Sequence, residues 1–414
     1  MKINSVKGMN DYLPADADLR DYLQNTILKI YKENGFDRII TPAVEDIENI
    51  EKSEGGDNLN LIFKILKRGE KLERTIEAHK FSDLSDMGLR YDLTLPLSRY
   101  FANNRANLLI PFKCIQIDKV YRAERPQKGR LRELVQCDID ILGSNSYFCE
   151  IELIAVTAKA LLEIGLSDFK VRINDRRILK ELLLSFGFSE AEIGTVCVSF
   201  DKIGNIGFNG VEEELRNKKL SSASISHFML FLNTLPVDIE KIDSLLPGNE
   251  YIEYLKQIIS GVRQICGGRY SIEYDVSLVR GQGYYTGTVF EIESNEFKDS
   301  IAGGGRYDNL IGKFINETIP AVGFSIGFER IFCILSEKNY KIPNVKKRIA
   351  ILYEDFFAAY NKAQDFQAKY DVALFERPQK LGKFFNKLES QGYYGYIITD
   401  DNNEIKVLNG NHIY

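Results

Sequence analysis

A strongly basic segment from Phe112 to Gly143, here called the basic ribbon, constrains the fold more than any other part of the chain. Two runs of β-type residues flank a short loop, which predicts two strands joined by a tight connection. The cations that crowd this loop are Arg122, Arg125, Lys128, Arg130 and Arg132. Like charges this close repel one another, so we expect the ribbon to bind a polyanion such as a nucleoside triphosphate or an RNA end.

The outgoing strand of the basic ribbon has two different faces, because side chains alternate along a strand. The apolar face consists of Val135, Cys137, Ile139 and Ile141. The opposite face consists of Gln136, Asp138 and Asp140. A polar, acidic face suited to a small cationic or hydrogen-bonding ligand therefore lies next to a loop suited to phosphates.

Composition and charge limit the class of protein. A length of 414 residues is enough for two or three domains, and a hydrophobic content of 44% is typical of a globular protein. The formal net charge of -5 excludes nucleic-acid binding driven by bulk charge. If RNA binds, it must bind to local basic patches such as the basic ribbon.

Cysteine and histidine are scarce and scattered. The six cysteines form no C-x-x-C pair, and several lie in apolar patterns, which is typical of reduced core thiols in a cytosolic protein. The histidines are His79, His227 and His412, and they form no cluster. The sequence therefore predicts neither a zinc site nor histidine-based acid–base catalysis.

The sequence also bears on location. No apolar run is long enough to span a bilayer. The N-terminus lacks the apolar core of a signal peptide. We therefore expect a cytoplasmic protein with no membrane partner.

The first half of the chain combines helices with short strands. Apolar residues at helical spacing predict an amphipathic helix over residues 16–34, and a strand follows over residues 36–45. Residues 50–88 are charged and less periodic, so we expect a helix and then a mobile loop around residues 68–83. A strand that enters a helix begins at Leu89, and residues 148–164 form a further helix.

The second half divides into three parts. Residues 168–265 are expected to alternate short strands with helices, and we interpret part of them as an insertion. Strand signals return over residues 270–293, before a glycine cluster at 302–308 and a strand that passes into a helix at 320–336. After a linker, a β-α-β-α-β-β order predicts a small, separate α/β domain with a mostly parallel sheet.

Charged residues lie in β-type, otherwise apolar surroundings in four segments: residues 89–94, the basic ribbon, 278–291 and 323–331. Buried charges are costly unless they are paired. Several arginines, with glycines nearby that permit close approach of a ligand, favour a triphosphate site. No G-x-x-x-x-G-K-[ST] sequence occurs, so this site is not a P-loop.

Taken together, these segments resemble the histidyl-tRNA synthetase family of the class II aminoacyl-tRNA synthetases, over essentially the whole chain. Residues 7–14 and 35–45 look like the entry segment and motif 1 of that family. The basic ribbon looks like motif 2, and residues 320–331 look like motif 3. Residues 278–291 and 302–308 resemble two segments specific to the histidine enzymes, which makes the match more specific than class II alone.

The resemblance implies a fold and a reaction. The fold is an α+β catalytic domain over residues 1–340, with a mixed, mainly antiparallel class II sheet flanked by helices and an insertion at about 168–265. Residues 346–414 would form a shortened α/β domain of the anticodon-binding type. The implied substrates are ATP with Mg²⁺, L-histidine and histidine tRNA, which receives histidine at its 3′ end. The resemblance also implies a homodimer formed through motif 1.

The resemblance further implies roles for individual residues. Around ATP these are Arg122 at the α-phosphate, Arg280 between the histidine carboxylate and the α-phosphate, Glu124 at the adenine amino group, Arg130 at the outer phosphates and Arg330 at the γ-phosphate. Arg122 and Arg280 are implied to be catalytic. Around histidine they are Asp92, Thr94 and Gln136 at the α-amino group, and Asp140, Tyr285 and Tyr307 at the imidazole. Arg125, Gln127 and Lys128 would contact the acceptor end of the tRNA. No side chain is predicted to be a metal ligand.

Strand geometry agrees with the proposed histidine site. Gln136 and Asp140 are four residues apart on one face, which is about 13 Å along a strand. That span can bracket a small amino acid, with one polar group near each end. A carboxylate that accepts the imidazole N–H would reject apolar analogues, because they would leave it buried and unpaired.

The chain departs from the family pattern in one signature. The usual Arg-Gly-Leu-Asp-Tyr-Tyr carries Gln282 and Gly283 in place of leucine and aspartate, so a carboxylate near the histidine pocket is missing. Two alternatives therefore stay open. One is a non-catalytic regulatory subunit of ATP phosphoribosyltransferase with a similar fold, and the other is a paralogue that aminoacylates an acceptor other than tRNA. The arginines at 122, 130, 280 and 330 favour the synthetase.

Overall fold

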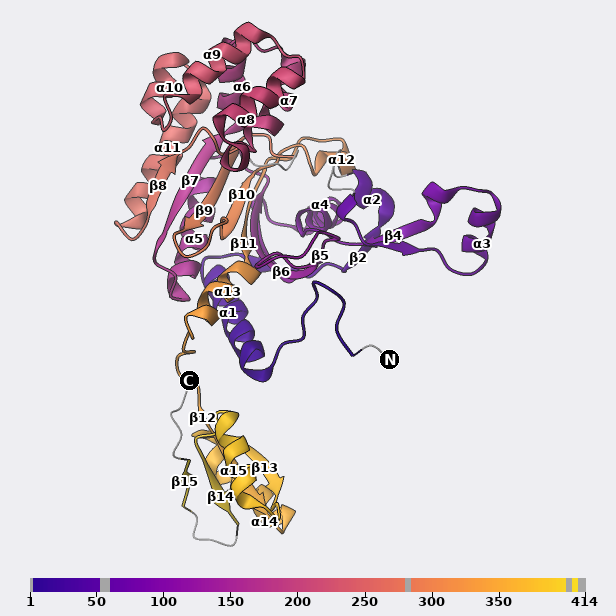
Figure 1. Cartoon of the computed structure of the whole chain (residues 1–414), viewed down its shortest axis with the longest axis vertical. Helices are drawn as coiled ribbons and strands as arrows, with labels where there is room; N and C mark the ends of the chain where they lie inside the picture. The colour runs from indigo at the N-terminus through magenta and orange to yellow at the C-terminus, as the bar shows by residue number, and fades with distance from the viewer. Residues whose placement is uncertain (1–2, 53–59, 280–283, 400–403, 409–414) are drawn as a thin grey trace. The chain divides into compact units, whose positions relative to one another are not determined.

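The fold is given by a computed structural model that describes residues 3–52, 60–279, 284–399 and 404–408. The chain forms two compact units, Met1–Lys338 and Asn339–Tyr414. Each unit has its own sheet, and the first unit also carries a small additional sheet. The two units are shown in Figure 1 and are described separately here.

The first unit is built on an eight-stranded sheet with the order β1-β5-β6-β11-β10-β9-β7-β8 (Figure 1). Its strands are β1 (Asp37–Arg38), β5 (Phe112–Tyr121), β6 (Glu133–Leu142), β7 (Phe169–Asp175), β8 (Ser271–Tyr274), β9 (Thr288–Ser294), β10 (Ala302–Arg306) and β11 (Ala321–Gly327). The pairs from β5 to β7 across the sheet are antiparallel, and only the edge pairs β1–β5 and β7–β8 are parallel. The predicted mixed, mainly antiparallel sheet is confirmed.

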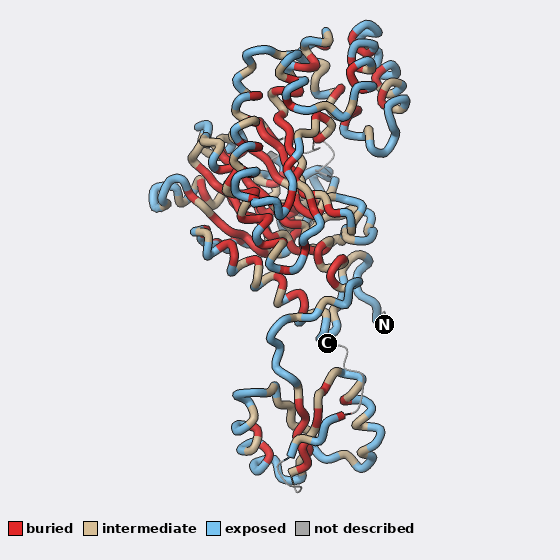
Figure 2. The backbone as a smooth tube through the Cα atoms, turned by 90° about the vertical axis from the view of Figure 1, so that its left-hand side faces the viewer, coloured by how far each residue is buried: buried red, intermediate tan, exposed pale blue. Residues whose placement is uncertain are grey.

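Helices pack on this sheet and bury its apolar residues. They include α1 (Pro14–Glu33), α5 (Phe148–Glu163), α11 (Glu250–Cys266) and α13 (Phe328–Glu337). Helix α1 confirms the predicted amphipathic helix, and its residues Leu23, Ile27 and Tyr31 are fully buried. In Figure 2 the buried stretches gather along the strands of the large sheet, where burial of apolar surface stabilises the unit.

A small three-stranded sheet has the order β2-β4-β3 and precedes helix α4 in the chain. It consists of β2 (Val44–Asp46), β3 (Lys64–Leu66) and β4 (Ser85–Leu89), with α2 (Ile47–Lys52) beside it and α4 (Thr94–Asn104) after it. The single strand predicted over residues 36–45 is wrong. It is divided into β1 and β2, on either side of Pro42, whose ring removes a ladder donor.

The mobile loop predicted around residues 68–83 is also wrong. This segment contains helix α3 (Glu70–Glu77) and a 3₁₀ turn, Phe81–Asp83. Helix α3 buries none of its side chains, and its only apolar residues are Leu72 and Ile76, one helical turn apart, which is a short signal among many charges. An ion pair of 2.9 Å between Arg74 and Glu70, one helical turn apart, supports it instead.

The predicted alternation of strands and helices over residues 168–265 is not observed. Strand β7 belongs to the large sheet, and the rest is helical: α6 (Arg176–Ser185), α7 (Glu190–Phe200), α8 (Ile203–Asn217), α9 (Ser222–Leu232), α10 (Ile239–Leu245) and α11. Its β-type residues, such as Val196, Phe200 and Phe228, pack between helices in a local core. Tertiary packing therefore overrides their strand propensity.

Helices in the described residues were compared with the length and hydropathy needed to cross a membrane. No single described helix meets both requirements. The pair α6 and α7 passes only when taken together, and it is bent by 113°.

The second unit confirms the predicted β-α-β-α-β-β order. Its elements are β12 (Lys347–Tyr353), α14 (Phe356–Gln367), β13 (Tyr370–Glu376), α15 (Leu381–Ser390), β14 (Gly395–Ile398) and β15 (Lys406–Val407). The sheet order is β13-β12-β14-β15, with only β15 antiparallel. Alternate residues of β12 pack against α14 on one face and α15 on the other, which gives the unit two small apolar cores.

Candidate functional site

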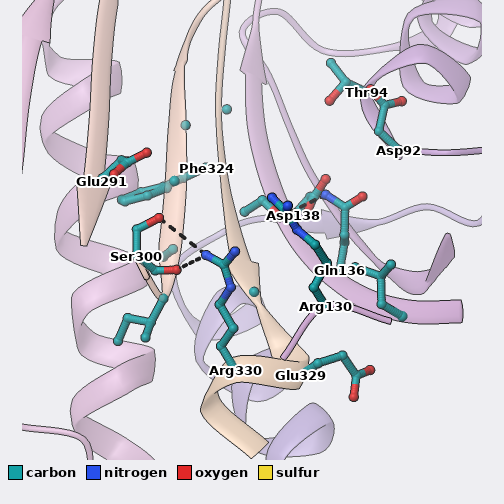
Figure 3. Close-up of a pocket in the computed structure, with 18 of the residues that line it drawn as sticks. Asp92, Thr94, Arg130, Gln136, Asp138, Glu291, Ser300, Phe324, Glu329 and Arg330 are labelled. Carbon is teal, nitrogen blue, oxygen red and sulfur yellow. Dashed lines mark hydrogen bonds between the residues drawn. The ribbon is translucent and has the colours of Figure 1, made fainter. Parts of the chain in front are cut away.

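A cavity of about 340 Å³ lies over the centre of the large sheet (Figure 3). Residues from β6, β9, β10 and β11 line it, together with the loop between β5 and β6 and the first turns of α4 and α13. The predicted residues that line it are Asp92, Thr94, Arg122, Arg130, Gln136, Asp140, Tyr285, Tyr307 and Arg330. Segments that are more than half the chain apart, such as those of Asp92 and Arg330, therefore meet in one cavity.

One wall of the cavity is the polar face of β6. The alternation predicted for this strand is confirmed, because Cys137 and Ile139 are fully buried in the core while Gln136, Asp138 and Asp140 line the cavity. Neighbouring β11 must leave room for the carboxylates. A Cβ atom on Gly323, which pairs with Asp140, would overlap the Oδ1 atom of that residue.

One end of the cavity, here called the acidic end, contains a buried tyrosine–carboxylate pair. The Tyr307 hydroxyl donates to Oδ1 of Asp140 at 2.6 Å. Burial raises the pKa of the Asp140 carboxyl to about 7, against the lowering effect of this hydrogen bond. Tyr285 also lines this end, and a Cβ atom on Gly305 would lie only 2.8 Å from its ring. The predicted glycine cluster lies in strand β10. Glycines are needed there because larger side chains would collide with the aromatic residues of the pocket.

The start of α4 provides a further buried carboxylate. Oδ1 of Asp92 accepts a hydrogen bond of 3.2 Å from the Leu95 N–H, so this side chain supports the first turn of the helix as well as lining the cavity. Burial raises the pKa of Asp92, while the bond from Leu95 and the charge of Arg122 lower it. Thr94, the first residue of α4, lies beside it.

Cations occupy the other side of the cavity. The Nε atom of Arg122 donates to the Tyr91 carbonyl at 2.9 Å. Arg330 projects from the first turn of α13, where it donates to the carbonyl and the hydroxyl of Ser300 and lies 3.8 Å from a carboxylate oxygen of Asp299 (Figure 3). Guanidinium groups in such positions can neutralise the oxygens of a polyphosphate.

The other predicted residues of this loop, Glu124, Arg125, Gln127 and Lys128, do not line the cavity. Glu124 pairs with Arg130 at 3.1 Å. Gln127 forms backbone hydrogen bonds with Arg130 that close the turn of the loop, and Lys128 pairs with Glu337 at 2.6 Å on the surface. Arg125 is part of the same loop. The predicted Arg280, with the substituted Gln282 and Gly283, lies outside the described residues.

Sequence reasoning missed several residues that line the cavity: Asp138 as a site residue, Tyr284, Glu291, Ser300, Ser325 and Glu329. Glu329 is the best anchored of them, since Arg20 of α1 holds both of its carboxylate oxygens at 2.7 and 2.8 Å. Its Oε1 also accepts the Val135 N–H at 3.1 Å. The only sequence signal was its position directly before Arg330.

The arrangement can bind a ligand with two chemically different ends. The acidic end can accept hydrogen bonds from a cationic or N–H-bearing group, and the arginine-lined side can bind phosphates. Among the described residues, no group of three or more His, Cys, Asp or Glu side chains is placed to hold a metal ion by itself.

Comparison with protein families and curated proteins gives a consistent result. A family model described as histidyl-tRNA synthetase matches residues 8–331. A histidine–tRNA ligase of Leifsonia xyli subsp. xyli is 42% identical, and the match covers 96% of this chain and 95% of that protein. The histidine–tRNA ligase of Cytophaga hutchinsonii is 36% identical over 80% of this chain and 77% of its own.

Solved structures share the fold. Histidyl-tRNA synthetase from Nostoc sp. PCC 7120 matches with a TM-score of 0.78 and 27% identity, over 96% of this chain and 91% of that one. A Bacillus halodurans C protein, described as an ATP phosphoribosyltransferase regulatory subunit/histidyl-tRNA synthetase, also has a TM-score of 0.78. It covers 96% of this chain and 98% of its own at 22% identity, so that likeness concerns the fold alone.

Proposed function

The chain belongs to the histidyl-tRNA synthetase family, and from this premise we propose that it activates L-histidine with ATP and transfers it to the 3′ end of histidine tRNA. The observation that carries this proposal is the two-ended cavity. Its acidic end has the chemistry to bind an amino acid with an N–H-bearing ring, and its arginine-lined side suits a triphosphate.

The acidic end would recognise histidine. Because Tyr307 occupies one oxygen of Asp140, the carboxyl presents its second oxygen to an imidazole N–H, and Tyr285 packs beside the ring. Asp92, Thr94 and Gln136 would surround the α-ammonium group. A ligand with an apolar side chain would leave Asp140 buried without a ligand partner, which disfavours its binding.

The opposite side would hold ATP. Arg122 and Arg280 are proposed at the α-phosphate, Arg330 at the γ-phosphate, and Glu124 and Arg130 at the adenine and the outer phosphates. The ion pair between Glu124 and Arg130 at 3.1 Å must open for both to take these roles. The Arg130 side chain is half-exposed, so solvent screens this pair and opening it costs less than opening a fully buried one.

The chemistry needs positioning more than a covalent group on the protein. An oxygen of the histidine carboxylate attacks the α-phosphorus, the bond from that phosphorus to the bridging oxygen breaks, and pyrophosphate leaves. A ribose hydroxyl at the tRNA 3′ end then attacks the activated carbonyl, and AMP leaves. Arginines stabilise the negative charge that develops on the phosphate oxygens.

Mg²⁺ would bind to this site together with the triphosphate of ATP. Mg²⁺ is usually held by substrate phosphates with one or two carboxylates. Such binding does not need a cluster of three protein ligands, and the described residues contain none. Glu291 of β9 lines the cavity and would be the carboxylate that contacts the ion. When bound, the ion would neutralise charge on the phosphates.

The remaining partners follow from the loop and from the second unit. Arg125, Gln127 and Lys128 would contact the acceptor end of the tRNA, with Lys128 exchanging its surface partner Glu337 for phosphate. The α/β unit Asn339–Tyr414 would bind the anticodon region. We further propose a homodimer formed through the segments that resemble motif 1.

Two linked assays test the proposal. Histidine-dependent exchange of pyrophosphate into ATP reports adenylation, and charging of histidine tRNA reports transfer. Both activities are expected. Absence of exchange under all conditions would overturn the enzyme proposal and favour the regulatory subunit, whereas exchange without charging would point to an acceptor other than tRNA.

A further inference from the structure

A buried ion pair ties strand β10 to helix α5 next to the acidic end of the cavity. Nε and Nη2 of Arg306, the last residue of β10, each donate at 2.8 Å to a carboxylate oxygen of Glu150 on α5. The hydroxyl of Thr288, the first residue of β9, donates to the same carboxylate at 2.9 Å. These three buried residues, Glu150, Thr288 and Arg306, are here called the rear clamp.

The register of the sheet places the rear clamp on the face opposite to the cavity. Arg306 pairs with Val322, and Val322 pairs with Ile141. Residues that pair across strands share a face, and Ile141 belongs to the apolar face of β6, away from the residues that line the cavity. No residue of the rear clamp lines the cavity. Its effect on a ligand must therefore pass through neighbouring residues.

The neighbours of the rear clamp are residues of the acidic end. Tyr307 directly follows Arg306, and because successive side chains alternate, it points to the cavity side. Tyr285 lies three positions before Thr288. The segment between them is also tied to β10, since the Thr286 N–H donates to the Arg306 carbonyl at 2.8 Å. The rear clamp therefore fixes the backbone on which both tyrosines stand.

A third connection reaches the strand of Asp140. Nη1 of Arg306 donates at 3.1 Å to the carbonyl of Ser144, which follows Asp140 by four positions. The guanidinium thus uses all three of its nitrogens, two toward Glu150 and one toward Ser144. A guanidinium is planar and donates in fixed directions, so these contacts set the positions of three segments relative to one another.

From this geometry we infer that the rear clamp consists of positioning residues for amino-acid selection, which hold the acidic end in the shape that binds the imidazole. The inference rests on the proposed function, because it concerns how that site takes histidine. A shift of β9 or β10 would move Tyr285 or Tyr307, and it would disturb the 2.6 Å hydrogen bond from Tyr307 to Asp140. A network of buried hydrogen bonds of this kind makes a site rigid.

The cations of the phosphate side stand on other elements. Arg122 and Arg130 belong to the loop between β5 and β6, and Arg330 belongs to α13. Damage to the rear clamp should therefore raise the KM for histidine much more than the KM for ATP. A general loosening of the fold would raise both.

Two single substitutions test the inference by pyrophosphate exchange. Thr288→Val keeps the shape of the side chain and removes one donor to Glu150, so the KM for histidine is expected to rise about threefold. Arg306→Lys keeps the charge but loses the fork of donors, and a rise of about tenfold is expected. The KM for ATP should stay within about twofold of wild type in both variants. Thr288→Ser restores the hydroxyl and should restore the KM for histidine.

A double variant tests whether Arg306 acts through its neighbour. Tyr307→Phe removes the hydroxyl that donates to Asp140, and it should raise the KM for histidine by itself. Once that hydroxyl is absent, a displaced β10 has less to disturb. The combined rise in Arg306→Lys with Tyr307→Phe is therefore expected to be smaller than the product of the two single rises.

A matched control is Ser199→Ala in helix α7, outside the cavity. It also removes a buried hydroxyl that donates to a carboxylate, here that of Glu214 at 3.1 Å, and it should leave both KM values unchanged. Thermal unfolding of every variant checks the fold. Thr288→Val and its serine rescue decide the question if Arg306→Lys fails to fold.

Three results would overturn the inference: an unchanged KM for histidine in the folded clamp variants, an equal rise in the KM for ATP, or effects of Arg306→Lys and Tyr307→Phe that multiply. A wild-type protein without exchange would instead overturn the proposed function.

Discussion

The two sides of the cavity are built in opposite ways. At the acidic end, Asp140 and Tyr307 are 4% and 2% exposed and already joined at 2.6 Å. On the phosphate side, the Arg130 side chain is 50% exposed and engaged with Glu124. A buried pair in a medium of low dielectric is rigid and selective. A half-exposed cation can exchange a protein partner for a ligand at little cost. Selectivity is therefore expected to depend on the acidic end, and ATP binding to be spread over several arginines.

The largest effect should come from the centre of the acidic end. Asp140→Ala removes the acceptor for the imidazole N–H and leaves the Tyr307 hydroxyl without its partner. We expect kcat/KM for histidine in pyrophosphate exchange to fall about 100-fold or more, with the KM for ATP changed by less than about threefold. Equal losses for both substrates would show that the two sides are not independent.

The pH dependence of stability should reveal the same carboxyl. Because burial raises the pKa of Asp140 to about 7, the folded chain holds this proton between about pH 4 and pH 7 while the unfolded chain has released it. The contribution of Asp140 to stability is therefore lost as pH rises through that window. Between pH 5 and pH 8, the free energy of unfolding of Asp140→Asn should therefore rise by about 2 to 3 kcal/mol relative to that of wild type.

Thermal unfolding midpoints of Asp140→Asn and wild type, measured at both pH values, check this prediction. The difference between the two proteins should grow in favour of the variant at pH 8. A difference independent of pH would mean that Asp140 is already ionised in the folded chain at pH 5.

An intermediate effect is expected on the phosphate side. Arg130→Ala removes one of several cations, so the KM for ATP should rise about tenfold or less, and the KM for histidine should not change. The loss should shrink at high salt, since partly exposed charges are screened. A collapse of histidine binding in this variant would contradict the division between the two sides.

The smallest effect is predicted at the loop tip. Lys128 and Glu337 form an exposed ion pair at 2.6 Å, so Lys128→Ala should leave the thermal midpoint and pyrophosphate exchange unchanged. The KM for histidine tRNA in the charging assay should rise about two- to threefold, through the loss of one phosphate contact. Reduced exchange in this variant would place Lys128 in the adenylation step instead.

The strand that carries the acidic end was predictable, because an alternation of period two depends only on local sequence. Gln136 and Asp140 were placed on one face of a strand for that reason, and the structure brings both to the cavity. The long-range contacts around this strand were not predictable. Arg20 and Glu329 are 309 positions apart, and Gln136 and Ser325 are 189 apart, with no pattern that links them.

Local sequence patterns also failed to predict secondary structure in two regions, where the burial of the side chains does not match their helix or strand propensity. Helix α3 has no buried side chain and only two apolar residues, Leu72 and Ile76, so its sequence predicts a charged loop. In the region 168–265, the sequence predicts short strands between helices, whereas β-type residues such as Val196 and Phe228 are buried within helices. In both places the deciding interactions are tertiary or electrostatic, which a window of sequence does not contain.

The most direct test of the account is pyrophosphate exchange by the wild-type protein with each of the standard amino acids in turn. The account predicts exchange with histidine, and background with glutamine, asparagine, lysine and arginine, because none of these four side chains has a ring that places an N–H donor at Asp140 while it packs beside Tyr285. Exchange driven by any other amino acid in preference to histidine, or by none, would contradict the assignment of the acidic end.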